Sequence, residues 1–331
     1  MRAILFRFGD LAMTEPTLSR RALLGAAAAL AAGPALAKAP LAGAPTAAAY
    51  RYKVGDVEVT AIHDGFAMRP LDGFIKNADL ADVQKAMAEA GLPTDKLPIT
   101  FTTLVVNDGK ALTLIDTGNG DSGAPTSGAW MRNFKAAGFD PKDVDAVVIS
   151  HFHGDHINGL RLKDGTAMFP NAEIRVPEAE WAYWMDDAKM AAAPDGLKGN
   201  FQNVRRVFGP VAKDVKMFSD GKEAASGLIA VATPGHTPGH TSFALQSGAG
   251  KLMVMSDLTN HPALFVRNPD WAAVFDMDAA QAAATRKKML EMAASEKTQV
   301  AFYHAPFPAT GFIVKDGGGW RFAPAQVSSA L

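Results

Sequence analysis

The chain has 331 residues, of which 48% are hydrophobic and 20% are charged, and its formal net charge at pH 7 is −1. This composition suits a soluble globular protein with one large domain or two smaller ones. The balanced charge excludes capture of nucleic acid by a basic surface. The chain has no cysteine. Disulfides and thiolate ligands are therefore excluded, and any metal must be held by histidine and carboxylate groups.

The first 37 residues have the pattern of an export signal. Ser19-Arg20-Arg21 precedes an alanine-rich apolar run that ends at a small-residue cleavage site, Ala35-Leu36-Ala37. This arrangement resembles a twin-arginine signal. The run is shorter than the roughly 20 strongly apolar residues of a spanning helix, so no stable membrane anchor is expected. The expectation is a signal peptide over 1–37, read by the twin-arginine export machinery, and a periplasmic or secreted protein. An unchanged periplasmic yield after replacing both arginines by lysine would refute it.

Residues 38–49 are rich in proline and alanine and are expected to form a linker. Hydrophobic spacing then predicts alternating strands and helices. In chain order, these are a strand over 52–62 with a turn at 63–65, a helix over 80–90, a hairpin of strands 102–106 and 111–115 that ends at Asp116, and a helix over 129–137.

The second half of the chain continues the mixed pattern. It predicts a buried strand over 146–149, a strand over 172–176, a helix from Pro177 that carries Trp181 and Trp184, a strand over 228–231, a hairpin of strands 242–245 and 252–255 that ends at Asp257, a helix from the cap Asp278 to Ser295, and a strand over 300–303. The second hairpin mirrors the first, which indicates a weak internal repeat. No linker-like break interrupts residues 50–331, so a single domain is expected there.

The most informative stretch follows the buried strand and reads Ser-His-Phe-His-Gly-Asp-His over residues 150–156. Four nitrogen and oxygen donors within six residues are hard to explain by packing. Gly154 and Asp155 are turn formers, so the strand should end near Ser150. His151 and His153 can then converge on one metal from the loop, while Asp155 and His156 face a second.

Four further donors lie at the ends of predicted strands or in loops: Asp116 in LIDTG, His236 in TPGHTPGH, Asp257 in VMSDLTNHP and His304 in FYHAPFP. With this set, the chain resembles the metallo-β-lactamase superfamily over most of its length. The resemblance implies an α/β (α+β) fold. Its architecture would be a four-layer αββα sandwich of two facing mixed sheets, with the metal loops along one edge.

The resemblance also implies a role for each donor. The first metal would be bound by His151, His153 and His236, the second by Asp155, His156 and His304, and Asp257 would bridge them. Asp155 and Asp257 would also act in catalysis, and Asp116 and His240 would support the ligands. Imidazole and carboxylate ligands suit two zinc ions best, although iron, manganese or cobalt also fit.

Two such metals lower the pKa of bound water toward roughly 7, so a bridging hydroxide is expected at neutral pH. The site would then stabilise the oxyanion formed on an ester or phosphoryl centre. The C-terminal third resembles the branch that contains methyl parathion hydrolase and periplasmic lactonases. Smaller acyl-homoserine lactonases have a tyrosine three residues after the bridging aspartate, where this chain has Asn260.

The sequence therefore predicts a binuclear metallo-hydrolase of neutral lactones and esters, with phosphotriesterase activity alongside and little activity on β-lactams. Alternatives are a β-lactamase, a glyoxalase II-like thioesterase, an iron-dependent oxidoreductase and an inactive metal-binding protein. The substrate would be a small neutral molecule, and a homodimer is possible. The expected substrate pocket lies beside the metal loops and consists of Phe66, Phe74, Leu258, Asn260, His261, Phe307 and Pro308, with no cationic clamp.

Overall fold

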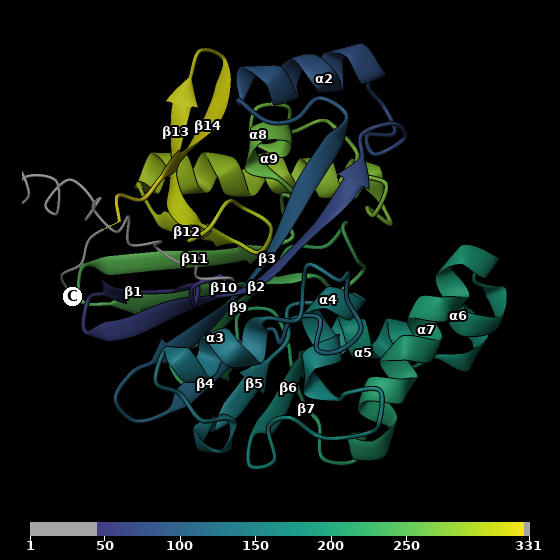
Figure 1. The fold of residues 1–331 in the computed structure, drawn as a ribbon, viewed down its shortest axis with the longest axis vertical. Helices are drawn as coiled ribbons and strands as arrows, with labels where there is room; N and C mark the ends of the chain where they lie inside the picture. Colours follow the sequence, from purple (N-terminus) through teal and green to yellow (C-terminus); the bar gives the residue numbers. More distant parts are fainter. Residues whose placement is uncertain (1–44, 328–331) are drawn as a thin grey trace, which may run out of the picture. The chain divides into compact units, whose positions relative to one another are not determined.

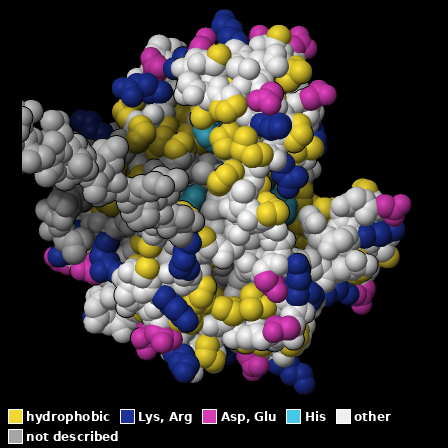
Figure 2. Space-filling view, viewed as in Figure 1, with side chains coloured by type: hydrophobic (Ala, Val, Ile, Leu, Met, Phe, Trp, Pro, Cys, Tyr) yellow, Lys and Arg dark blue, Asp and Glu magenta, His cyan; other side chains and the backbone are white. Residues whose placement is uncertain are grey.

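The computed structural model describes residues 45–327. From Ala47 onward these residues form one compact unit. The export signal expected over 1–37, and the linker up to residue 44, lie outside the described residues. They remain predictions. Within the described part of the chain, no helix is both long and apolar enough to cross a membrane. On the face shown in Figure 2, basic and acidic side chains are interspersed.

Two seven-stranded sheets form the centre of this unit. The first sheet runs in chain order through β1 (Ala49–Val54), β2 (Val57–Pro70), β3 (Lys96–Asn107), β4 (Leu112–Ile115), β5 (Ala146–Val148), β6 (Glu173–Pro177) and β7 (Lys216–Phe218). The second sheet consists, in spatial order, of β14 (Gly319–Pro324), β13 (Thr310–Asp316), β12 (Gln299–Phe302), β11 (Gly250–Ser256), β10 (Thr241–Ser247), β9 (Leu228–Ala232) and β8 (Glu223–Ala225).

Helices cover the outer face of each sheet (Figure 1). One group is α3 (Trp130–Ala136), α4 (Gly154–Ile157), α5 (Glu178–Trp184), α6 (Asp187–Ala192) and α7 (Asp195–Phe208); the other is α2 (Leu80–Glu89), α8 (Pro262–Phe265) and α9 (Ala279–Glu296). The core between the sheets includes Leu104 and Phe243. Phe134 of α3 belongs to the cluster between the first group of helices and its sheet, and Leu290 of α9 to the cluster between the second group and its sheet. The expected αββα sandwich is therefore confirmed.

The first predicted strand is wrong in detail. Residues 52–62 form parts of two antiparallel strands, because Gly55 takes a left-handed φ of 59° and turns the chain. A Cβ at Gly55 would overlap the backbone of Ser247, so only glycine fits this turn. The turn expected at 63–65 is instead a bulge inside β2, whose pairing with β3 continues to Pro70. Strand β1 also begins at Ala49, inside the expected linker.

The two halves repeat one arrangement at the strands that carry the site. Strands β3 and β4 pair antiparallel and β4 then pairs β5 in parallel; β10, β11 and β12 follow the same order. The second strand of each hairpin ends at a non-glycine residue with positive φ, 59° at Asp116 and 44° at Ser256. Ser256, and not Asp257 as expected, is therefore the counterpart of Asp116.

A close approach between α9 and the loop after β9 can be tested at Gly235. This residue has φ of 130°, and a Cβ there would overlap the backbone of Ala282 at the start of α9. We expect Gly235→Ala to lower the free energy of unfolding by at least about 3 kcal/mol, measured by urea unfolding of the metal-free protein. The matched control is Gly221→Ala, with φ of 70° and, apart from its chain neighbours, no described residue within 4 Å of the added Cβ. It should cost only about 1–2 kcal/mol, and equal losses would contradict the steric argument.

Candidate metal centre

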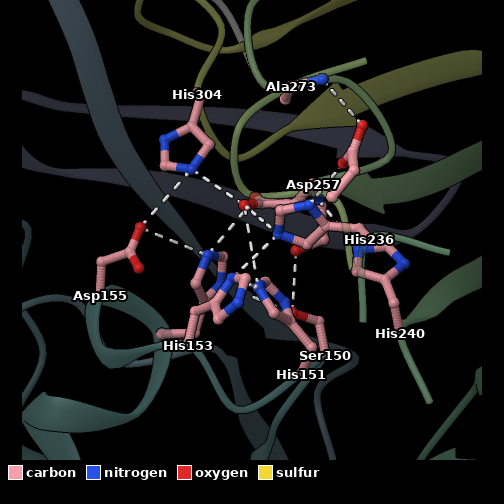
Figure 3. A network of polar contacts seen from close by, with 12 residues as sticks. Ser150, His151, His153, Asp155, His236, His240, Asp257, Ala273 and His304 are labelled. Carbon is pink, nitrogen blue, oxygen red and sulfur yellow. Dashed lines mark hydrogen bonds and ion pairs between the residues drawn. The ribbon is translucent and has the colours of Figure 1, made fainter. Parts of the chain in front are cut away.

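All seven expected ligands converge where strands of the two sheets end, and six of them, all except His156, are labelled in Figure 3. They form two groups in which the donor atoms lie within 4.8 Å of one another: His151, His153, His236 and Asp257, and Asp155, His156 and His304. The first two histidines occupy the loop after β5, and Asp155 and His156 lie in α4. His236, Asp257 and His304 follow β9, β11 and β12. The ligands are thus supplied from the ends of strands in both sheets.

The ring nitrogens of the first group point at one another. His153 Nδ1 lies 3.0 Å from His151 Nε2 and 3.0 Å from His236 Nε2. Each neutral imidazole carries a single N–H. That one proton cannot both donate to a partner behind the ring and lie between the nitrogen lone pairs that face one another in front. His156 Nε2 and Asp257 Oδ1 are also buried, and neither has a hydrogen-bond partner among residues 45–327. Such a set of donors fits divalent cations, and nitrogen and oxygen ligands of this kind suit zinc.

Asp257 lies between the two groups. Its Oδ2 is 3.3 Å from His236 Nε2 and 3.0 Å from His304 Nε2, and its Oδ1 is 3.4 Å from His156 Nε2. One carboxylate therefore faces donors of both groups, which is the placement needed for a ligand shared by two cations. Asp155 lies 3.5 Å from both His156 Nε2 and His304 Nε2, on the more open side.

The pKa shifts of the donor side chains are those of a site that attracts a cation. Burial lowers the pKa values of His151 and His153, so both rings are neutral and can bind a cation. Burial acts in the same direction on His156, but nearby carboxylates, led by Asp257, outweigh it and raise the pKa well above its usual value. Burial alone would raise the pKa of Asp257, yet His304 and His156 hold it well below its usual range.

Asp116 orients His156 from behind, as a supporting carboxylate would. Its side chain accepts hydrogen bonds of 2.8 Å each from Ser150 N, Ser150 Oγ and His156 Nδ1. Because the carboxylate can only accept, Nδ1 of His156 carries the proton and Nε2 is left to face the metal position.

His240 supports the site from the other sheet and is not one of the converging donors. Its Nε2 accepts a 3.1 Å hydrogen bond from the backbone N–H of Asp257. The proton must therefore lie on Nδ1, which is 3.1 Å from Thr233 O and 2.8 Å from Thr233 Oγ1. Burial lowers the pKa of His240 to about 3, so the ring stays neutral and holds the backbone of Asp257 in place.

Sequence reasoning missed a second supporting carboxylate. Asp276 Oδ1 lies 3.0 Å from His236 Nδ1, which fixes that ring with Nε2 toward the other donors. Arg286 of α9, only 1% exposed, lies 3.3 Å from Asp276 Oδ2 and donates a 2.8 Å hydrogen bond to Leu258 O. One arginine thus holds Asp276 and the segment next to Asp257. In the sequence, Arg286 looks like one of several cations on a surface helix.

Asp64 and Tyr303 were also missed. Asp64 is fully buried and accepts hydrogen bonds from the backbone N–H groups of Asn119, Gly128 and Trp130, which fixes the loop after β4. The Tyr303 hydroxyl donates a 2.6 Å hydrogen bond to Asp155 O, and its ring centroid is 3.9 Å from that of His156. In the sequence, Asp64 looked like part of the turn at 63–65, and Tyr303 looked like the last residue of the strand over 300–303.

A cleft of about 540 Å³ opens above the donors His153, Asp155 and His304. Its walls differ in chemistry. The apolar wall is defined by the lining side chains of β2, β3 and the segment before α9, which are Ala67, Met68, Ile99, Phe101 and Phe275, together with Arg69. The polar wall is defined by the amide and hydroxyl groups that other loops and helices supply, from Asn119, Ser122, Asn158, Asn200 and Asn260.

Of the expected pocket residues, Asn260 lines this cleft. The expectation was wrong for two others, because Phe74 and Leu258 are buried in hydrophobic clusters and their side chains serve packing. His261 is also elsewhere: its Nδ1 accepts from Ala263 N and caps α8.

Phe66, Phe307 and Pro308 do not line the cleft either. Phe66 is 36% exposed on β2, and the ring of Phe307 packs 5.5 Å from that of His63. Closeness in sequence to a metal-bearing loop does not fix the direction of a side chain. The expected lack of a cation is also corrected, because Arg69 lies in the lining, with its guanidinium 5.8 Å from the Phe275 ring centroid.

Comparison with known proteins places this site in a family. The model of the metallo-beta-lactamase superfamily matches residues 96–304, a range that includes all seven donors. The chain therefore belongs to the metallo-β-lactamase superfamily.

Particular relatives include characterised lactonases. The N-acyl homoserine lactonase AttM of Agrobacterium fabrum is 31% identical over 134 residues, which are 38% of this chain and 45% of the relative. The matched segment thus spans about half the length of that protein. Among solved structures, the dizinc quorum-quenching lactonase AidC, in complex with a product, N-hexanoyl-L-homoserine, is 26% identical with a TM-score of 0.80, covering 85% of this chain and 99% of AidC. The hydrolase AbOPH is 27% identical with a TM-score of 0.81, covering 86% and 100%.

The ligand grouping is tested by removing donors one at a time. We expect His304→Ala to lose the second metal before the first, because that group then retains only two donors besides Asp257. Asp257→Ala should also lose the second metal more readily and should weaken the first, since Asp257 faces both groups. Metal per chain, measured by elemental analysis after dialysis, is the readout. His63→Ala, a histidine outside both groups, is the control, and two metals retained in His304→Ala would refute the assignment.

Proposed function

We propose that this protein is a metal-dependent hydrolase that opens neutral lactones, with N-acyl homoserine lactones as the substrate class, and that it works with two divalent ions, preferably zinc. The observation that carries the proposal is a cleft with both apolar and amide side chains in its lining, onto which three of the seven converging donors, His153, Asp155 and His304, open. The relation to AttM and AidC supports the same substrate class.

The apolar wall suits an acyl chain. Ile99 and Phe101 of β3 and Phe275 of the segment before α9 lie on it, and Met68 is 44% exposed at the same cleft. An acyl chain buried against these side chains gains roughly 0.8 kcal/mol for each CH₂ removed from water. A charged substrate would find few partners on this wall.

The polar wall suits an amide and a lactone ring. Asn158 is held in position because Asn203 and Arg206 of α7 both donate to its Oδ1, at 2.9 and 3.0 Å. Asn260 is only 4% exposed, and its Oδ1 has no hydrogen-bond partner in the described part of the chain. That oxygen can accept a hydrogen bond from a substrate N–H. Without such a donor, it remains a buried acceptor whose desolvation is not compensated.

The chain's own groups then hold and move protons around the reacting ester. When two divalent ions are bound, they supply a hydroxide nucleophile at neutral pH and positive charge for the oxyanion. Asp155 lines the cleft, while Asp257 is buried beneath it, so both carboxylates lie next to the reacting position. With Asn260 in place of a tyrosine at that position, we assign to the Asp257 carboxylate the transfer of the nucleophile's proton to the leaving alkoxide.

Other activities are weaker candidates. Neutral phosphotriesters share the lack of charge, so we include them as secondary substrates. β-Lactams carry a carboxylate that would need a cation. The cleft lining supplies Arg69, but its guanidinium already lies beside the Phe275 ring, so we rank β-lactams below neutral substrates. An iron-dependent oxidoreductase would be expected to have lost a ligand of the second metal, and so would an inactive metal-binding protein, but all seven donors are present.

The direct test is a hydrolysis screen of purified protein loaded with zinc, against lactones of several acyl lengths, aryl esters, thioesters, phosphotriesters and β-lactams. We expect the highest kcat/KM on N-acyl homoserine lactones. A higher kcat/KM on β-lactams than on every lactone would overturn the proposal. In that case Arg69→Gln should remove the β-lactam activity selectively.

The apolar wall gives a sharper prediction at Phe275. We expect Phe275→Ala to raise KM for ten-carbon acyl lactones about tenfold more than for four-carbon ones, because only the longer chain reaches this ring; tenfold corresponds to about 1.4 kcal/mol. The kcat should change little. Phe312→Ala, which removes a 38% exposed ring on β13 outside the cleft, is the control. Equal losses on short and long chains would show that Phe275 serves only the fold.

A further inference from the structure

A buried glutamate outside the donor set connects the two loops of the metal centre. Glu180, in the first turn of α5, is fully buried. Its Oε2 accepts hydrogen bonds from Phe152 N at 2.9 Å and Trp184 Nε1 at 2.8 Å, and its Oε1 accepts from Gly239 N at 2.7 Å. In the described part of the chain, no lysine or arginine forms an ion pair with it.

The two backbone donors lie in the two loops that carry the histidines of the first metal group. Phe152 lies between His151 and His153, and Gly239 lies between His236 and His240. The three histidines of the first metal group are thus all carried by the two loops that Glu180 joins. Closer to the strands, the same loops are linked by a 3.0 Å hydrogen bond from Thr241 N to Ser150 O. Glu180 provides the outer link, where the ligands are.

The packing around this link leaves little freedom. A Cβ at Gly239 would overlap the backbone N of Glu180, so the loop lies directly against the start of α5. Trp184, the third donor, also faces the site, with its ring centroid 6.5 Å from that of His153. A shift of Glu180 would therefore move both loops and the indole that flanks His153.

We propose that Glu180 is a positioning residue that sets the separation between His151 and His153 on one loop and His236 on the other, and thereby the affinity of the first metal position. The inference rests on the metal centre and not on the identity of the substrate. It also explains why a carboxylate is buried here without a cationic partner: three N–H groups converge on it.

The chemistry of the three donors requires a carboxylate. Burial raises the pKa of Glu180, while the Thr237 hydroxyl and the N–H groups of Gly239, Phe152 and Trp184 favour its ionised form and oppose that rise. Glutamine has nearly the same shape but only one acceptor oxygen. If the NH₂ group of the glutamine takes the place of Oε1, it faces the N–H of Gly239; if the NH₂ group takes the place of Oε2, it faces the N–H groups of Phe152 and Trp184. In either orientation the hydrogen bond to one of the two loops is lost.

The experiment compares Glu180→Gln with Glu178→Gln. Glu178 lies on the same helix but is exposed, and its carboxylate accepts a hydrogen bond from Ser219 Oγ. Both changes are made in the wild-type chain and in the His304→Ala variant, which should retain only the first metal position. Zinc affinity is measured by competition with a chelator, and Co²⁺ absorption reports ligand geometry at that position.

We expect Glu180→Gln to weaken the first metal position by 10- to 100-fold and to change its Co²⁺ spectrum, with Glu178→Gln within twofold of the parent. Unchanged affinity and spectrum in a folded Glu180→Gln protein would overturn the proposal, even if thermal stability fell. Should Glu180→Gln not fold, Glu180→Asp, which keeps the charge but is too short to reach both loops, must show the same selective loss. These readouts do not use lactone hydrolysis, so they are independent of whether the proposed substrate is correct.

Discussion

The metal centre depends on fixing the direction of buried imidazole rings. A histidine can present a lone pair to a cation only if its other nitrogen is held elsewhere, and each partner here comes from a different part of the fold. Asp116 binds His156 Nδ1, Asp276 lies 3.0 Å from His236 Nδ1, and Thr100 O lies 2.7 Å from His304 Nδ1. These partners leave the Nε2 atoms facing one another, which is unfavourable without a cation between them.

The duplicated sheets explain how so many donors reach one place. Strands β4 and β5 end at the same edge as β11 and β12, so loops far apart in sequence are brought together. Positive φ at Asp116 and Ser256 turns the chain sharply at the two equivalent strand ends. Ser256 Oγ donates to Ser150 Oγ at 2.8 Å, which ties the two halves together directly beneath the histidines. The strain of those two residues is stored where the site is built.

Buried charged residues then transmit the packing of the outer helices to the site. Arg286 of α9 holds Asp276 and the segment after Asp257, while Glu180 of α5 joins the loops of His151, His153 and His236. Each helix therefore contributes more than apolar burial. Neighbouring elements contribute to the cleft, since α7 braces Asn158 and the segment before α9 supplies Phe275. The metal donors and the cleft lining are thus both held by this side of the helical layers.

The sequence by itself determined the donor set and most of the helices and strands. The ligands could be identified because few residue types bind metals and the spacing from His151 to His156 is local; the helix capped by Asp278 was clear because capping and periodicity are local too. Only the tertiary structure decided that residues 52–62 form a hairpin, that Asp276, Arg286 and Glu180 support the histidines, and that Arg69 and Phe275 line the cleft while Phe74 and Leu258 do not. These features depend on strand register and on packing between distant segments, which local sequence patterns do not encode.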